Sequence, residues 1–144
     1  MVKHEINFTA FEIIDWYDGP TCALCKSQEP DEWFFANIVF IDFERRKRIF
    51  VLIQLNAAQS AYLFQALLKT VPGQKRSSIL LGKTLRDFIQ GYDGAVWLFE
   101  TDNLDKKSKT IISVDRSFLK YFKSLDEVMN QSKKAKKKWL DVFK

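Results

Sequence analysis

Two stretches of this chain are apolar on both sides of any β-strand that they could form. In residues 33–43 the apolar side chains occupy both alternating sets of positions, and residues 48–54 repeat the pattern. Because successive side chains of a strand point to opposite faces, strands of this kind must be covered on both faces. We therefore expect two central strands, with either the C-terminal helix or a second copy of the chain covering the second face.

Turn signals separate these two segments from their neighbours. An Asp-Gly-Pro sequence at 18–20 follows an apolar run at 8–16. Glycine accepts a positive φ and proline fixes the φ that opens the next segment, so a hairpin with a return strand at 21–27 is predicted. A charged turn at 44–47 joins the two central strands. The first four strands are therefore predicted to form an antiparallel meander.

The rest of the chain mixes helical and strand patterns. Helical spacing predicts a helix after Asn56 and a shorter one over 84–90, and residues 95–100 and 110–114 are expected to pair as strands. Two final helical stretches follow. The predicted class is α+β: an antiparallel sheet that starts with a four-strand meander, helices packed on it, and a basic amphipathic helix at the C-terminus.

The net charge of the chain is confined to its C-terminal end. Up to residue 132 the 17 Lys and Arg balance 17 Asp and Glu, whereas 133–144 hold six lysines and one aspartate, which gives the formal charge of +5. We therefore expect a single α+β domain over 1–132 and a lysine-rich end of the last helix over 133–144. A neutral domain with such an end is typical of a binding device or of a solubilised docking helix.

The C-terminal segment has the periodicity of an amphipathic helix. Its apolar positions recur at steps of three and four residues and form one stripe, made of Leu125, Val128, Ser132, Ala135, Trp139 and Val142. The candidate contact residues here are Lys133, Lys134, Lys137, Lys138 and Trp139. Such a helix can lie on an anionic membrane, insert into a groove of a partner, or grip nucleic acid. It can equally dock its stripe on the sheet of this protein and leave the lysines in water.

Two turns are also rich in cations. The turn between the central strands carries the candidate contact residues Arg45, Arg46, Lys47 and Arg48, and a later turn carries Lys106, Lys107 and Lys109. Phosphate backbones reward such clusters because binding releases condensed counterions. Lysine on loops and edge strands also blocks association between sheets, and that explanation needs no ligand.

Cys22 and Cys25 have the spacing of a redox pair or of half a zinc site. On the predicted return strand, positions three apart point to opposite faces and lie about 10 Å apart, too far for a disulfide. A zinc site would need two further ligands, and His4 is the only histidine. We therefore predict reduced thiols, no structural disulfide and no metal site.

The sequence offers no familiar catalytic constellation. A single histidine removes most hydrolase triads, and the Gly-Lys-Thr at 82–84 lacks the upstream glycine of a phosphate-binding loop, because Ser77 stands in its place. Carboxylates near the turns, Asp15, Asp18 and Asp31, could perform acid–base chemistry, but such side chains commonly accept hydrogen bonds from local backbone amides. We predict no catalytic residue and no cofactor.

The chain shows neither a secretory leader nor a membrane span. Its first residues lack the apolar core of a signal peptide, and its longest apolar stretch is far too short to cross a bilayer. The two cysteines are expected to stay reduced. These features predict a cytoplasmic protein without a transmembrane segment.

One combination of motifs resembles a known family. Trp16-Tyr17-Asp18-Gly19-Pro20 between two strands, and Thr84-Leu85-Arg86-Asp87-Phe88 ahead of residues 94–99, resemble an uncharacterised bacterial domain of unknown function. In that domain an Asp-Gly-Pro hairpin precedes a small sheet, and a Leu-Arg-Asp helix leads to another strand. The resemblance covers residues 8–101 and implies no reaction and no catalytic residue.

These observations favour a non-enzymatic protein-interaction or regulatory module, for example of the antitoxin or immunity type. A protein partner is expected, and a homodimer is one way to cover the second face of the sheet. The alternative is a nucleic-acid-binding protein that uses the basic hairpin tip and the C-terminal lysines, with binding that weakens as salt rises. A third hypothesis, an enzyme with carboxylate chemistry, offers no substrate.

Overall fold

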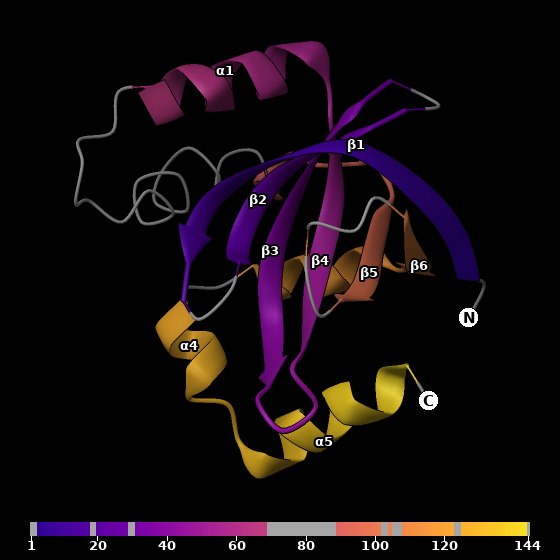
Figure 1. Cartoon of the computed structure of the whole chain (residues 1–144), viewed down its shortest axis with the longest axis vertical. Helices are drawn as coiled ribbons and strands as arrows, with labels where there is room; N and C mark the ends of the chain where they lie inside the picture. The colour runs from indigo at the N-terminus through magenta and orange to yellow at the C-terminus, as the bar shows by residue number, and fades with distance from the viewer. Residues whose placement is uncertain are drawn as a thin grey trace.

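Six antiparallel strands pair in sequence order and close into a barrel (Figure 1). The computed structural model describes residues 3–17, 20–28, 31–68, 89–101, 104, 108–122 and 125–143. The strands are β1 (Lys3–Trp16), β2 (Pro20–Ser27), β3 (Trp33–Asp42), β4 (Lys47–Leu55), β5 (Val96–Thr101) and β6 (Ser108–Val114). Each pairs with its neighbours in the sequence, and β1 also pairs with β6.

Helices flank the barrel in the part of the chain that the structure describes. They are α1 (Ala57–Leu68), the 3-10 helix η2 (Arg116–Tyr121), α4 (Leu125–Met129) and α5 (Lys133–Val142). Asn56 caps α1 as predicted: its Oδ1 accepts a hydrogen bond from the Gln59 backbone N–H at 2.8 Å, and Gln59 Oε1 accepts one from the Asn56 N–H at 3.0 Å. Most of the helix predicted at 84–90 lies outside the described residues.

The predicted α+β class is wrong, because the sheet closes on itself. The meander of β1 to β4 and the pairing of β5 with β6 follow the prediction, and the strands are antiparallel throughout. The error lies in the way the two-sided apolar strands are covered. Closure turns one face of every strand toward an interior that the strands fill for the most part themselves, with Leu104 and with Val128 of α4 added, so that most of the helical covering is needed on the outside.

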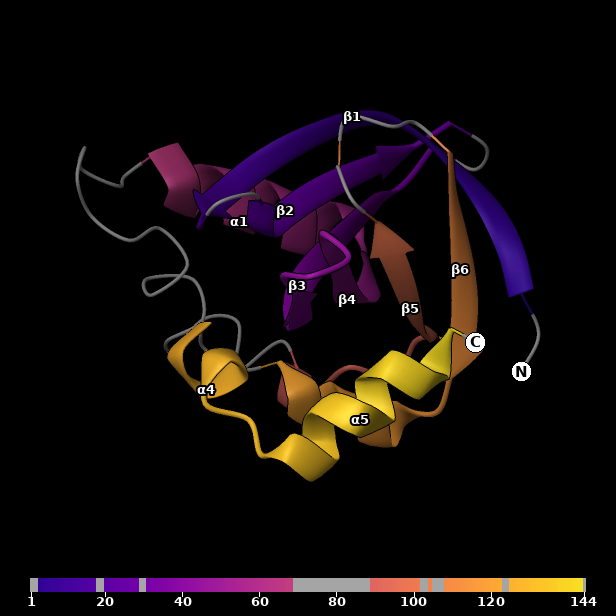
Figure 2. The ribbon, with the colours of Figure 1, turned by 60° about the horizontal axis from the view of Figure 1, so that its bottom comes forward.

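β1 closes the barrel by dividing its pairing between two strands. Its first part pairs with β6, from Lys3 opposite Ile112 to Asn7 opposite Ser108, and its second part pairs with β2. The register with β2 shifts between Phe8 and Ala10, which marks a bulge, and bulges bend a strand and increase its twist. Figure 2 shows β1 arching over the barrel on the side away from α4 and α5.

Aromatic rings fill the interior of the barrel. The Phe8 ring of β1 lies 6.0 Å from the Phe34 ring of β3 and 6.2 Å from the Phe99 ring of β5, measured between centroids. Neither strand is a neighbour of β1, so these contacts run across the interior. Phe50 and Phe99 stack with centroids 5.2 Å apart. The bulge after Phe8 lets Phe8 and Phe11, three positions apart, join the same cluster.

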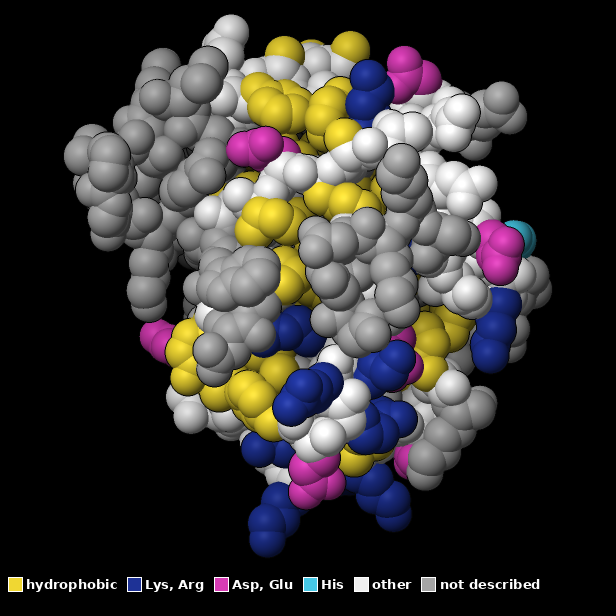
Figure 3. Space-filling view, in the orientation of Figure 1, with side chains coloured by type: hydrophobic (Ala, Val, Ile, Leu, Met, Phe, Trp, Pro, Cys, Tyr) yellow, Lys and Arg dark blue, Asp and Glu magenta, His cyan; other side chains and the backbone are white. Residues whose placement is uncertain are grey.

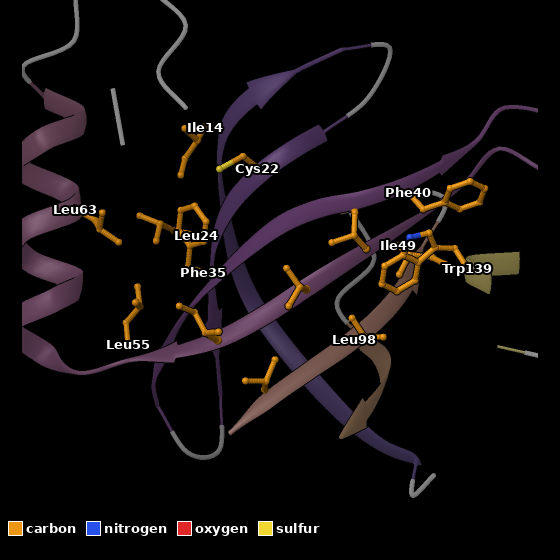
Figure 4. Packing of buried hydrophobic residues seen from close by; sticks show 14 residues of the cluster. Ile14, Cys22, Leu24, Phe35, Phe40, Ile49, Leu55, Leu63, Leu98 and Trp139 are labelled. Carbon is orange, nitrogen blue, oxygen red and sulfur yellow. The ribbon is translucent and has the colours of Figure 1, made fainter. Parts of the chain in front are cut away.

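A second cluster covers the outer face of β2 to β5. Leu63 of α1 lies beside Leu24, Phe35 and Leu55 at one end of this face, and Trp139 of α5 lies at the other end (Figure 4). Helices of the same chain therefore cover the second face of the central strands, and this covering needs no second copy.

The two cysteines belong to different clusters. Cys22 packs in the outer cluster and Cys25 in the interior cluster, and the two do not form a disulfide. The prediction that positions three apart on this strand face opposite sides is confirmed.

The C-terminal segment is two helices where one apolar stripe suggested a single helix. Ser132 begins α5: its hydroxyl oxygen accepts a hydrogen bond from the Ala135 backbone N–H at 3.2 Å. Val128 of α4 packs with the interior cluster, whereas Trp139 of α5 packs with the outer one. Between the helices, Gln131 Nε2 donates a hydrogen bond to the Val39 carbonyl, in the bulged part of β3. The predicted stripe is therefore divided between the two cores.

Replacement of Phe99 by leucine should weaken the barrel. Phe99→Leu removes the ring contacts with Phe8 and Phe50 and leaves a smaller interior side chain, so we expect a loss of about 1 to 2 kcal/mol in the free energy of unfolding. Urea unfolding followed by circular dichroism measures the loss. Phe43→Leu, the same change at an exposed position, should cost less than about 0.5 kcal/mol. Equal losses in the two variants would contradict the assignment of an aromatic interior.

Candidate functional site

Lys and Arg side chains gather at the lower end of the molecule (Figure 3). We call this surface the basic end and define it as the exposed or partly exposed cations of the β3–β4 turn and of α5, namely Arg45, Arg46, Lys47, Lys133, Lys134, Lys136, Lys137 and Lys138. It contains all the predicted contact cations except Arg48.

α5 is held on the barrel by one buried ring and by Leu140 and Val142, which pack partly buried against the outer cluster. Trp139 is 2% exposed, and its ring makes edge-on contacts with Tyr121, at 4.9 Å between centroids, and with Phe118, at 6.3 Å. Both partners belong to η2, which begins at Asp115, whose carboxylate accepts a hydrogen bond from the Ser117 backbone N–H at 2.8 Å. Trp139, which was predicted to contact a partner, therefore anchors the helix to the barrel and is not available to a partner.

The lysines of α5 point away from this anchor. Lys133, Lys134, Lys136 and Lys137 are exposed, and Trp139 is the only buried residue of the helix. Lys136 is absent from the predicted contact residues because its spacing from Ser132 and Trp139 places it on the side of the apolar stripe. Trp139 is buried, and Leu140 and Val142 pack partly buried against the outer cluster, so it is the lysines of α5 that remain in solvent. The run of five cations between Ser132 and Trp139 was the available signal.

Lys138 lies at the border between the anchor and the solvent. Its Nζ donates a hydrogen bond to the Tyr121 hydroxyl oxygen at 2.7 Å and lies 5.1 Å from the centroid of that ring and 5.6 Å from that of Phe118. This hydrogen bond stabilises the phenolate, and it lowers the pKa of Tyr121 below its ordinary value despite an opposing contribution from burial. The cation–π contacts hold the start of the last turn of α5 against η2.

The β3–β4 turn is fixed by its own charges. Asp42 Oδ1 accepts hydrogen bonds from the backbone N–H groups of Glu44 and Arg45, and Arg45 Nε lies 2.5 Å from Asp42 Oδ2. Burial acts to raise the pKa of Asp42, but the hydrogen bonds from Arg45 and Glu44 outweigh it and hold that pKa below its ordinary value. The guanidinium of Arg45 also lies 3.8 Å from Glu100. Arg45 is therefore engaged within the turn.

Two other side chains of this turn are presented to solvent. Phe43 is 55% exposed. Arg46 is exposed and has a φ of 55°, in the left-handed region that glycine or asparagine usually occupies. The chain thus places an arginine where glycine, which has no Cβ, would fit at lower cost.

Arg48 does not belong to the basic end. It lies on the same face of β4 as Phe50, an interior residue, and is 6% exposed. Its two terminal nitrogens donate hydrogen bonds to the Pro20 carbonyl at 3.1 Å and to the Tyr17 carbonyl at 2.7 Å. Arg48 therefore ties the β1–β2 turn to β4. The alternation of side chains along β4 was the signal that separated it from Lys47, whereas Arg46 lies in the turn before the strand.

Lys109 is buried as well. It precedes the interior residue Ile111 by two positions on β6 and is 4% exposed. Its charge acts on the Cys25 thiol: burial raises the pKa of Cys25, and the ammonium of Lys109 opposes that rise. Lys106 and Lys107, the other two cations predicted at this turn, lie outside the described residues.

The predicted carboxylate chemistry gains no support from geometry. Asp31 is exposed and lies 3.4 Å from Lys26 Nζ, Asp18 lies outside the described residues, and so does the side chain of Asp15. Within the described ranges, no three His, Cys, Asp or Glu side chains gather as metal ligands, and His4 is exposed. A polar hollow of about 300 Å³ beside the start of β1 is lined by Glu5, Ile6, Asn7 and Gln28, and Glu5 is the one carboxylate among these described lining residues.

Comparison of the chain with protein-family models, with curated proteins and with solved structures gives no match. The resemblance to a bacterial domain of unknown function stays a prediction. In the part of the chain that the structure describes, no helix combines the length and the apolar character that a membrane crossing requires.

Removal of the Arg48 guanidinium should destabilise the barrel. Arg48→Met keeps an apolar side chain of similar length but deletes the donors to Tyr17 and Pro20, so we expect a loss of about 2 to 3 kcal/mol in the free energy of unfolding. Chemical denaturation measures the loss. Arg46→Met, two positions away and exposed, should change stability by less than about 0.5 kcal/mol. Similar stabilities of the two variants would show that Arg48 does not tie the turn to β4.

Tyr121 should ionise at a lower pH than an ordinary tyrosine. Because the folded state binds the Tyr121 proton more weakly than the unfolded state does, folding stability should rise with pH between the folded pKa and the ordinary value of 10.0. Tyrosinate absorbance during a pH titration follows the ionisation. Lys138→Met should move this transition to higher pH, whereas Lys137→Met should leave it in place. An unchanged titration in Lys138→Met would contradict the Lys138–Tyr121 hydrogen bond.

Proposed function

We propose that the chain is a non-enzymatic interaction module of the regulatory kind, which holds an anionic macromolecule at its basic end. The observation that carries this proposal is the docking of α5. One buried tryptophan and the contacts of Lys138 fix the helix, so that four lysines are presented from a rigid support.

The lysine row is unfavourable for the helix on its own. Lys133 and Lys137 are four positions apart, as are Lys134 and Lys138, and like charges at this spacing destabilise a helix by about 0.2 to 0.5 kcal/mol per pair. Among the described residues, no ion pair joins a carboxylate to Lys133, Lys134, Lys137 or Lys138. An anionic partner would relieve the repulsion, whereas solubility alone would be served by lysines and glutamates in alternation.

Two classes of partner fit this chemistry, an acidic protein surface and a nucleic acid. A protein partner would make the module an antitoxin-like or immunity-like regulator. The buried thiols of Cys22 and Cys25, which form no disulfide with each other, suit a reducing compartment, and we place the module in the cytoplasm.

A charge reversal on α5 tests the proposal. Fluorescence anisotropy with a labelled heparin oligosaccharide, used as a generic polyanion, should show that Lys137→Glu weakens binding about fivefold, since one reversed lysine removes about 1 kcal/mol of favourable interaction. Lys3→Glu changes the net charge equally at an exposed position of β1, outside the basic end, and should weaken binding less than about twofold. Equal effects of the two variants on heparin binding, or no binding of heparin by the wild type, would contradict the proposal.

A further inference from the structure

Phe43 is the most exposed large apolar side chain among the described residues, at 55%. It lies in the β3–β4 turn, within three positions of Arg46 and four of Lys47. Most other phenylalanines in the described part of the chain pack in the two cores or against them. An exposed ring inside a cationic surface is a combination that requires an explanation beyond solubility.

The kind of cation separates the two classes of partner. Lysine is depleted at protein–protein interfaces, where arginine, tyrosine and tryptophan dominate, because an ammonium group is costly to desolvate. A phosphate backbone is bound without such desolvation, through lysines and arginines that displace condensed counterions. The exposed cations of α5 are all lysines. This composition favours a nucleic acid over an acidic protein.

The exposed ring indicates which form of nucleic acid the surface fits. Proteins that bind single strands combine cations along the backbone with aromatic side chains on which bases stack. In a duplex the faces of the bases are already stacked on one another and are closed to a ring on a protruding turn. An unpaired base offers its face to Phe43.

We propose that the basic end binds single-stranded nucleic acid, with one base stacked on Phe43 and the phosphates held by Arg46, Lys47 and the exposed lysines of α5. This inference rests on the proposed function and assigns its partner. It changes the predicted set of contact residues, since Phe43 and Lys136 enter it, while Arg45 and Arg48 leave it as structural residues.

The turn is arranged in advance for this contact. Arg45 compensates the charges of Asp42 and Glu100, so these two carboxylates do not repel a phosphate with their full charge. The hydrogen bonds from the backbone to Asp42 fix the turn that carries Phe43. Arg46 keeps a left-handed backbone in spite of the cost that its Cβ brings, which is understandable if the side chain contacts a partner.

The experiment measures anisotropy of labelled oligothymidylate and oligouridylate of about 15 nucleotides, a duplex of the same length, and labelled polyglutamate. We expect both single strands to bind more tightly than the duplex and polyglutamate, with an affinity that falls as salt rises from about 50 to about 200 mM. The two single strands differ in the 2′-hydroxyl, and their ratio shows whether DNA or RNA is preferred. Tighter binding of polyglutamate or of the duplex would overturn the inference.

Phe43→Ala and Tyr62→Ala form the matched pair of variants. Both remove a half-exposed aromatic ring, from the β3–β4 turn and from α1 respectively. Phe43→Ala should weaken single-strand binding about tenfold, as the loss of one stacked base requires, and Tyr62→Ala should leave it unchanged. If Lys137→Glu weakens binding and Phe43→Ala does not, the stacking inference fails while the proposed function stands.

Arg46→Gly separates binding from folding. Glycine adopts a φ of 55° without strain, so this variant should be at least as resistant to urea as the wild type. It should nevertheless weaken single-strand binding about threefold through the loss of one phosphate contact. Wild-type affinity in a folded Arg46→Gly variant would remove Arg46 from the interface and overturn this part of the assignment.

Discussion

The divided pairing of β1 is the constraint on which the rest of the molecule depends. If β1 paired with β2 alone, the sheet would be open, and the ring of Phe8 would have no route to those of Phe34 and Phe99. Closure buries one face of all six strands inside the barrel. It also removes the two edge strands that an open sheet would expose to association with other chains. It leaves α1 and α5 with the covering of the outer face, while α4 contributes Val128 to the interior. A short helix such as α5 can therefore be held by Trp139 and its partly buried neighbours Leu140 and Val142, with its lysines left in solvent.

Local patterns in the sequence were sufficient for the pieces and insufficient for the closure. The two-sided apolar strands, the hairpins and the cap at Asn56 are all local signals, and the structure confirms them. The pairing of Lys3–Asn7 with β6 joins positions about a hundred residues apart, and neither segment carries a local sign of the other. The sequence does not indicate the bulge after Phe8 either, because no glycine or proline stands where the alternation of side chains shifts.

Side-chain alternation along β4 was the sequence pattern that could predict which cations of the candidate site are exposed and which are buried. Arg45 to Arg48 look like one cluster in the sequence, but they divide into an ion-paired residue, two presented cations and one buried anchor. Counting alternate positions back from Phe50 places Arg48 inside the barrel. In α5, Ser132 was counted as part of the apolar stripe, whereas its hydroxyl caps a new helix, which is the commoner role of serine before a helical run.

The bond from Gln131 to the Val39 carbonyl sets the spacing between the two halves of the basic end. Val39 lies four residues before Phe43 on the strand that leads into the turn, and Gln131 lies two residues before the first residue of α5. The cations of the turn and those of α5 are therefore both positioned by β3, which fixes the distance between them. Recognition of a ligand that contacts both groups would depend on the spacing of its charges. The protein would lose little conformational entropy on binding, because the two groups are already ordered.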